Sequence, residues 1–281
     1  MAATLAGAAG ARGNRCRPAD RRRVHGLADL RRRAGHWGAA ERLIAGQPLY
    51  DVNAPANEPY AFWYPPIIAQ VLAPFTLVLP PLAFTILWTA ALVVCLWALA
   101  DRNVFVALAL IAFLPVALEL RVRNVHLVVA VLVVLAIRRS WAFWIPAAAL
   151  KIAPAIGPIY LLAAGRRREA LLTAGAGFAV LFLSVVISPA AWVDFLRIVS
   201  DRAGSDTAGL PGVPYLARLA AGSLVAVLAG RRGGRVGEIG VVIAIMVANP
   251  TLWPNSFSLL LAVVPLARAW YRERGLAAAP G

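Results

Sequence analysis

The sequence predicts an all-α fold, a polytopic membrane bundle of about eight to ten transmembrane or re-entrant helices. First, 61% of the 281 residues are hydrophobic, whereas soluble domains average roughly 45–50%. Second, apolar stretches follow one another from about residue 62 to residue 270, and about 20 apolar residues cross a bilayer as a helix. Third, arginine clusters separate several stretches, namely Arg138-Arg139, Arg166-Arg167-Arg168 and Arg231-Arg232. Because lipid offers no hydrogen-bond partners, backbone in this setting must form helices.

The net charge of +15 comes almost entirely from arginine, because Lys151 is the only lysine. In a soluble protein this charge would indicate nucleic acid as a partner. In an apolar chain, arginines instead flank membrane helices and hold those ends on the cytoplasmic side. We therefore predict a multi-pass protein of the plasma membrane that is surrounded by lipids and binds no nucleic acid.

The sequence holds no common cofactor or metal signature. We find no P-loop, no HExxH, no GxSxG and no GxGxxG that opens a helix after a strand. Its two cysteines, Cys16 and Cys95, do not form a CxxC pair, so they favour neither a metal site nor a disulfide framework. We accordingly expect no metal and no cofactor.

Residues 1–37 differ from the rest of the chain. They are rich in Ala, Gly and Arg and hold no spanning segment, and no apolar region follows the charges as a signal peptide requires. We expect this stretch to be disordered or a misassigned start. Residues 38–44 read as a short amphipathic helix that Gly46 ends, and residues 47–60 read as a polar loop.

The membrane domain is expected to cover residues 38–270, followed by a short cytoplasmic tail at 271–281. Its apolar segments lie near residues 62–79, 82–100, 104–119, 125–137, 141–164, 169–187, 213–230, 237–249 and 256–270.

Segment 141–164 has arginines at both ends and contains Pro146, Pro154 and Pro158. Proline kinks or breaks a helix. We therefore predict two half-helices that enter and leave on the same side of the membrane.

The arginine clusters also predict which loops share a side. Residues 188–212 and 249–255 are expected outside, and the Asp101-Arg102 turn and the basic tail inside. The loop at 47–61 lies outside only if a second early segment is re-entrant. Segment 104–119, with Pro115 at its centre, is the best candidate.

Lys151 lies in the apolar run AAALKIAPAIGP. An ionisable side chain inside a membrane segment costs about 2.5–3.5 kcal/mol. Snorkelling to the interface is one way to avoid this cost. The neighbouring prolines favour another, in which a broken helix lines a polar cavity and Lys151 binds a phosphate or carboxylate.

The densest polar stretch between apolar segments is ELRVRNVH, residues 119–126. Arginine suits bidentate phosphate binding, so Arg121 and Arg123 are candidate ligands, although an ordinary loop with charged flanks fits the same pattern. His126 alone is more often a structural residue than a base.

Two further features are typical of any membrane protein. Tyr64 opens an apolar segment beside other aromatic residues, as in an interfacial belt. The turn at 249–255 joins two segments with two prolines and a tryptophan and ends at Asn255.

Transfer chemistry needs a base. Each acidic residue outside the cytoplasmic clusters is more commonly a solvated loop residue than a base. The candidates are Asp29, Asp51, Glu58, Asp194, Asp201 and Asp206.

Five stretches, in this order, resemble glycosyltransferase family 87. They are LIAGQPLYD, FWYPPIIAQVLAPF, RVRNVHLVVAVLVVLAIRR, AAALKIAPAIGPIYLLAAGRRREALLTA and NPTLWPNSFSLLLA. The resemblance covers about residues 38–270. It implies the GT-C membrane fold and a polyprenol-phosphate-mannose-dependent mannosyltransferase.

The resemblance also implies a reaction. Such an enzyme moves mannose or a similar hexose from a polyprenyl-phosphate donor to a lipid or glycan acceptor on the outer face of the membrane. An aspartate in the first external loop would be the general base, and cationic residues would stabilise the leaving phosphate. Asp29 is the nearest match to that aspartate, and Asp51 is the runner-up.

The remaining assignments follow from the same resemblance. Lys151 corresponds to the family's lysine before a proline, and Arg121, Arg123 and Asn124 lie near its polar GQxN-like stretch. We expect these four to bind the donor phosphate or sugar. The full set of expected substrate contacts is Tyr64, Arg121, Arg123, Asn124, His126, Lys151 and Asn255.

The chain departs from the family pattern at several places. The family's first membrane helix is missing before residue 38, Asp29 lies beside Arg31-Arg32-Arg33, and Asn255 stands where a histidine commonly follows the tryptophan. We expect residues 1 to about 36 not to be the natural N-terminus. The alternatives are a truncated or inactive GT-C relative, and a membrane transporter or lipid-binding protein. No matching pair of broken helices supports a transporter.

Overall fold

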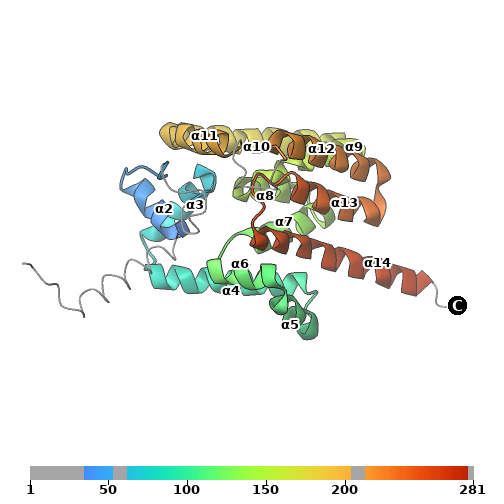
Figure 1. The fold of residues 1–281 in the computed structure, drawn as a ribbon. Helices are drawn as coiled ribbons and strands as arrows, with labels where there is room; N and C mark the ends of the chain where they lie inside the picture. The colour runs from blue at the N-terminus through green and yellow to red at the C-terminus, as the bar shows by residue number, and fades with distance from the viewer. Residues whose placement is uncertain (1–34, 53–61, 204–212, 278–281) are drawn as a thin grey trace, which may run out of the picture.

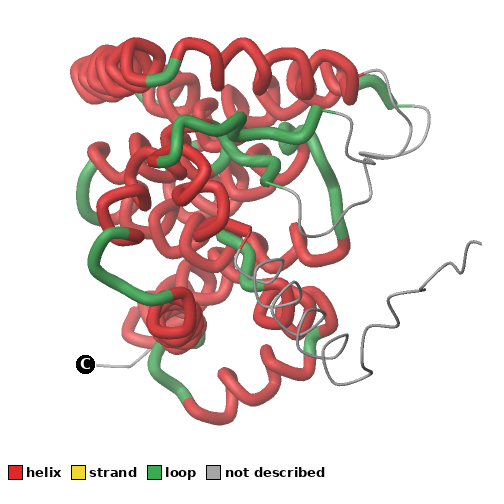
Figure 2. The backbone as a smooth tube through the Cα atoms, turned by 90° about the vertical axis from the view of Figure 1, so that its left-hand side faces the viewer, coloured by secondary structure: helices red, strands yellow, loops and turns green. Residues whose placement is uncertain are grey.

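The structure, a computed structural model, describes residues 35–52, 62–203 and 213–277. These residues form helices joined by short connections, and there is no strand among them (Figures 1 and 2). The predicted all-α class is therefore confirmed. Asp29, the first candidate for the base, lies outside the described residues.

Two described helices are long and apolar enough to cross a membrane, α4 (Pro81–Leu99) and α10 (Arg167–Ile187). Both carry large exposed apolar side chains, such as Val94 at 65% and Phe182 at 60% exposure. Water would disfavour such continuous apolar faces, whereas lipid covers them. The chain is thus a helical membrane protein.

A third span requires α5 (Val104–Ala112) and α6 (Leu114–Val122) to act together, but the two meet at a bend of 84°. Pro115 lies in the first turn of α6, where its missing N–H breaks no helix bond. The bend at this proline therefore makes segment 104–122 either a broken span or a re-entrant loop.

The predicted break within residues 141–164 is confirmed. The chain forms η1 (Trp141–Phe143), α8 (Trp144–Leu150), η2 (Ala153–Ile156) and α9 (Gly157–Ala163). Seven-residue helices span about 10 Å, roughly a third of the hydrocarbon core. Gly157 lies so close to Trp144 that a Cβ there would meet the indole at 2.5 Å, so a glycine is needed for the two arms to pack together.

The other helices are α2 (Gly35–Ile44), α3 (Pro66–Thr76), α7 (His126–Arg138), α11 (Pro189–Ala203), α12 (Tyr215–Arg232), α13 (Gly234–Val247), η4 (Pro254–Ala262) and α14 (Val263–Ala277). The predicted amphipathic helix is α2, which begins a few residues earlier than expected and ends before Gly46, a residue with φ of +64°. The segment after Ser188 was expected to be a loop outside the membrane, yet it begins with α11. The last apolar segment divides into a 3₁₀ helix and α14.

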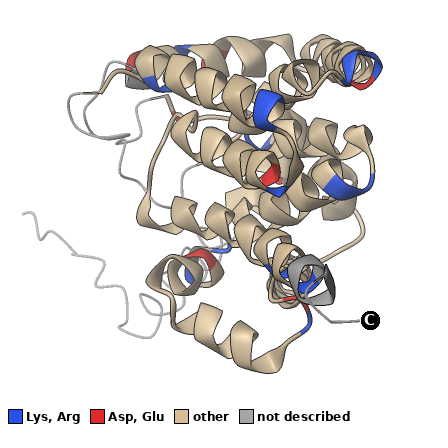
Figure 3. Cartoon of the chain, turned by 90° about the vertical axis from the view of Figure 1, so that its right-hand side faces the viewer, with Lys and Arg blue, Asp and Glu red and all other residues tan. Residues whose placement is uncertain are grey.

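The arginine-bearing turns gather at one end of the molecule. The α12–α13 turn and the C-terminal part of α14 lie at the right of Figure 1, opposite α2, α3 and α11, and Figure 3 views this end with basic residues at several turns. Asp101 accepts a hydrogen bond from Arg272 and lies 3.6 Å from Arg268 Nη1. The Asp101-Arg102 turn and the basic tail are therefore on one side, as the arginine pattern predicts.

The loop before residue 62 begins at the opposite end. Helix α3 has 11 residues, about 16 Å, and is too short to cross the hydrocarbon. Figure 1 places α2 and α3 together, away from the arginine-bearing turns. The short α3 therefore allows residues 47–52 to lie on the side of the membrane that faces away from Asp101.

Candidate functional site

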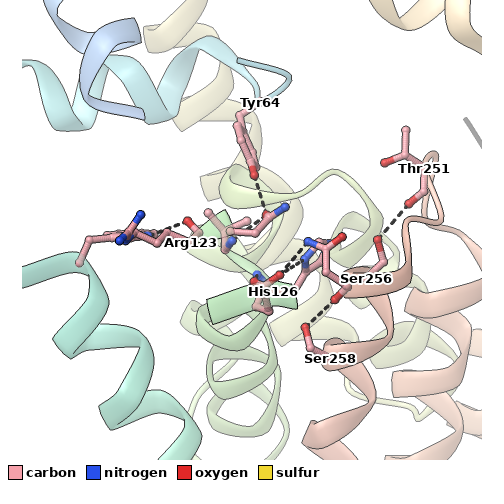
Figure 4. A network of polar contacts seen from close by, with 11 residues as sticks. Tyr64, Arg123, His126, Thr251, Ser256 and Ser258 are labelled. Carbon is pink, nitrogen blue, oxygen red and sulfur yellow. Dashed lines mark hydrogen bonds and ion pairs between the residues drawn. The ribbon is translucent and has the colours of Figure 1, made fainter. Parts of the chain in front are cut away.

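A buried carboxylate joins three segments at the centre of the molecule. Glu119 in α6 is fully buried. Its Oε1 accepts the main-chain N–H of His126 at 2.6 Å, and its Oε2 accepts the Asn255 side-chain amide at 2.9 Å and lies 3.0 Å from His126 Nδ1 (Figure 4). Such a group is tolerated inside a protein only when donors surround it. Here they come from the starts of α7 and η4.

The turn between α6 and α7 is set by Arg123. Its φ of +54° is left-handed, a conformation that reverses the chain at a helix end. Its carbonyl accepts the Trp88 indole N–H at 2.9 Å and its Nε donates to Thr89 Oγ1 at 3.1 Å (Figure 4). The Arg123 side chain therefore faces α4, whereas Asn124 faces the centre.

Tyr64 and Asn124 extend the polar centre toward α3. The Tyr64 hydroxyl donates to Asn124 Oδ1 at 2.5 Å, and the same oxygen accepts the Val125 main-chain N–H at 2.7 Å. The Tyr50 hydroxyl in turn donates to the Tyr64 carbonyl at 2.6 Å. These bonds fix the Tyr64 ring over the start of α7.

Lys151 lies at the break between α8 and η2, where it caps α8 in extended backbone. Its Nζ is 5.2 Å from the centroid of the Tyr64 ring, within the range of a cation–π contact. Its side chain is partly exposed, and among the described residues no carboxylate forms an ion pair with it. The amine is thus available to an anion from outside the protein.

His36 on α2 packs in an aromatic cluster with Tyr64 and with Trp88 of α4. The His36 ring lies 4.6 Å from the Tyr64 ring and 5.5 Å from Trp88, between ring centroids. Burial lowers the pKa of His36 to about 4, so this imidazole is neutral at physiological pH. Its Nε2 has no hydrogen-bond partner among the described residues.

The turn between α13 and η4 is held by a buried arginine. Arg218 at the start of α12 donates to the carbonyls of Asn249 and Pro250, each at 2.8 Å. The Ser258 hydroxyl donates to the carbonyl of Asn255 at 2.7 Å. These bonds orient the turn so that the Asn255 amide reaches Glu119.

The structure brings five of the predicted substrate contacts together, namely Tyr64, Asn124, His126, Lys151 and Asn255. Two others lie apart from this group, because Arg121 is exposed and Arg123 bonds to α4. We call the five residues, together with Glu119, the polar centre.

Two residues of this region were missed by the sequence reasoning. Glu119 carried a usable signal, since a carboxylate within the apolar helix LPVALELRV is costly unless it has a role. His36 lies at the edge of the arginine-rich stretch, and nothing in the sequence distinguishes it.

The three acidic candidates that the structure describes, Asp51, Asp194 and Asp201, are not part of this centre. Asp51 is exposed and follows Tyr50, and Asp194 lies 3.9 Å from Arg197 on α11. Asp201 is exposed on the same helix. Asp29, Glu58 and Asp206 lie outside the described residues. The described part of the chain holds no group of three or more His, Cys, Asp or Glu side chains that could bind a metal ion.

Comparison with known proteins gives one match. The sequence profile of glycosyltransferase family 87 matches residues 62–280, a range that includes the whole polar centre. No curated protein and no solved structure matches the chain.

Proposed function

This chain belongs to glycosyltransferase family 87, and from that premise we propose that it is a mannosyltransferase of the GT-C type. The donor is mannose, or a similar hexose, on polyprenyl phosphate. The acceptor is a hydroxyl group of a lipid or glycan. The reaction takes place on the outer face of the plasma membrane.

The observation that carries this proposal is the position of Lys151. A sugar-phosphate lipid brings one negative charge into a region that disfavours charge, and the leaving lipid phosphate carries two. Lys151 is the only lysine of the chain, lies beside Tyr64, which bonds to Asn124, and forms no direct salt bridge with a carboxylate among the described residues. Its ammonium group stabilises the charge that develops on the phosphate as the sugar leaves.

The transfer needs one proton acceptor. A carboxylate, Asp29 or in its place Asp51, takes the proton of the acceptor hydroxyl while that oxygen bonds to the anomeric carbon. The bond between this carbon and the phosphate oxygen breaks, and its electron pair stays on the lipid phosphate. Asp51 follows Tyr50, whose hydroxyl bonds to the Tyr64 carbonyl, so its loop borders the polar centre.

The other contacts divide into two groups. Tyr64, Asn124, His126 and Asn255 are already joined by hydrogen bonds, directly or through Glu119, and we expect them to contact the donor. Arg121 and Arg123 would contact it only after turning inward, since Arg121 is exposed and Arg123 bonds to Thr89. The first group therefore contributes more to donor binding than the two arginines.

The side of the reaction follows from the arginines. Basic flanks hold their helix ends in the cytoplasm, and the turn at Asp101 and the C-terminal part of α14 lie together at one end. Helices α2, α3 and α11 lie at the other end (Figure 1). The loop that holds Asp51 directly follows α2, which supports an extracytoplasmic site.

The test is transfer of labelled mannose from polyprenyl-phosphate mannose by the purified protein in vesicles. We expect the wild type to label a lipid or glycan acceptor, and Lys151→Met to lower kcat by more than about tenfold. Arg272→Met, at the arginine-bearing end, serves as the matched control and keeps the wild-type rate. Donor binding without transfer in the wild type, or full activity of Lys151→Met, would contradict the proposal.

A further inference from the structure

The hydrogen bonds of Glu119 determine where the proton of His126 lies. The main-chain N–H of His126 can only donate, so Glu119 Oε1 is an acceptor. Oε2 accepts the Asn255 amide and also lies 3.0 Å from His126 Nδ1. With an ionised Glu119 as the acceptor of all three contacts, a neutral His126 carries its hydrogen on Nδ1.

This tautomer leaves an unfilled acceptor. A neutral imidazole carries one N–H, so Nε2 presents a lone pair. His126 is 1% exposed, and its Nε2 has no hydrogen-bond partner among the described residues. Buried polar groups are nearly always paired, and an unpaired one beside a candidate site indicates a place for a ligand.

We propose that Glu119 is a positioning residue that fixes His126 as an acceptor for a hydroxyl group of the donor sugar. The inference rests on the proposed function and deepens it. A phosphodiester oxygen carries no hydrogen and cannot satisfy a bare Nε2, whereas every sugar hydroxyl can. The same carboxylate holds the Asn255 amide beside His126.

The two ends of the polar centre thus bind different parts of one donor. Lys151 and the Tyr64 ring form the phosphate end. Asn124 connects the ends, since its Oδ1 accepts the Tyr64 hydroxyl and its main-chain N–H donates to the Glu119 carbonyl at 3.3 Å. His126 and Asn255 form the sugar end. Phosphate and sugar are adjacent groups of the donor, and the protein places their partners in the same order.

Binding of two probes to the purified full chain in detergent tests this division. The probes are polyprenyl phosphate and polyprenyl-phosphate mannose. We expect His126→Phe to weaken binding of the mannose-bearing probe by about tenfold, the loss of one buried hydrogen bond, and to leave polyprenyl phosphate unchanged. Lys151→Met should weaken the binding of both probes. His126→Gln, whose side-chain oxygen lies near the position of Nε2, recovers part of the loss.

The tautomer can be read directly. The chain has three histidines, so selective ¹⁵N labelling of histidine gives a spectrum simple enough to assign with His36→Gln and His126→Gln. We expect the wild type to show a protonated Nδ1 and a bare Nε2 at His126. In Glu119→Gln the new side-chain amide can also donate a hydrogen bond, so we expect a mixture of the two His126 tautomers. This variant should weaken binding of the mannose-bearing probe to the same extent as His126→Phe.

Several outcomes would overturn the inference. A hydrogen on Nε2 in the wild type would remove the acceptor. Equal weakening of both probes by His126→Phe would show a structural role only. If the wild type bound neither probe, the proposed function itself would fail, and the inference with it.

Discussion

Glu119 lies in the polar centre and Asp101 lies at the arginine-bearing end, and the surroundings of these two carboxylates differ. Glu119 is fully buried and faces three donors from α7 and η4. Asp101 is 28% exposed and faces Arg268 and Arg272, the second of them 68% exposed. Exposed ion pairs are worth about 0–1 kcal/mol, whereas removing one partner from a buried group costs about 3–5 kcal/mol.

This difference separates two uses of charge. At the arginine-bearing end, the ion pairs of Asp101 are partly exposed, and each one contributes little to stability. At the polar centre a few groups hold a fixed geometry that water cannot replace. Changes at the polar centre should therefore alter activity or stability strongly, and equivalent changes at the arginine-bearing end should not.

The largest expected effect concerns the base. Asp29→Asn should lower the rate of mannose transfer by about 10²–10⁴-fold, because the acceptor hydroxyl loses its proton acceptor, while binding of the donor stays normal. Asp51→Asn tests the alternative base, and Asp101→Asn at the arginine-bearing end is the control that should keep the wild-type rate. A normal rate for Asp29→Asn with loss of transfer in Asp51→Asn would assign the base to Asp51.

The next effect compares the two carboxylates directly. Glu119→Ala leaves His126 and Asn255 without their buried acceptor, and we expect a loss of about 3–5 kcal/mol in the free energy of unfolding. Asp101→Ala should cost less than about 1 kcal/mol. Unfolding in mixed micelles measures both. Equal losses of unfolding free energy in the two variants would contradict the distinction between the polar centre and the arginine-bearing end.

Arg218 should give an intermediate effect. Arg218→Met deletes two charge-assisted hydrogen bonds to the carbonyls of the 249–250 turn, which are worth roughly 1.5–3 kcal/mol. The exposed Arg231→Met should change stability by less than about 0.5 kcal/mol. Donor binding should also weaken in Arg218→Met, since the turn carries Asn255. A stability equal to that of Arg231→Met would contradict this.

The smallest effect is a pH dependence from His36. The folded pKa of about 4 lies below the ordinary value of 6.5, so the unfolded chain binds a proton first as the pH falls. Stability from this group is therefore complete above about pH 6.5 and falls toward pH 4. Its loss at pH 6 should be on the order of 1 kcal/mol, and the difference between wild type and His36→Phe measures it. Parallel pH profiles would show that His36 does not titrate in this way.

Local features of the fold could be predicted from the sequence. Proline removes a helix hydrogen bond wherever it stands, so the break within residues 141–164 follows from three prolines. Arginine has a strong preference for one side of a membrane. This preference predicted that Asp101 and Arg272 lie at the same end of the molecule. The helix α11 was missed because its apolar face, with Phe195 and Ile198 buried, is interrupted by charges.

The site was harder to predict because its residues come from distant segments. Lys151 was recognisable as an unusual residue in an apolar run, whereas Tyr64 and Asn124 were expected contacts through the family resemblance. The contacts among the three depend on how α3, α7 and α8 pack. Glu119 was read as part of a charged flank, because the sequence does not show that α6 turns it inward. The bonds of Arg123 to α4 likewise depend on packing.

The most direct measurement is a structure of the full chain with a non-hydrolysable phosphonate analogue of polyprenyl-phosphate mannose. The polar centre is expected to hold this ligand, with the phosphonate within about 4 Å of Lys151 Nζ and a mannose hydroxyl donating to His126 Nε2. A phosphonate bound among the arginines at the opposite end, or a sugar directed away from His126, would contradict the account.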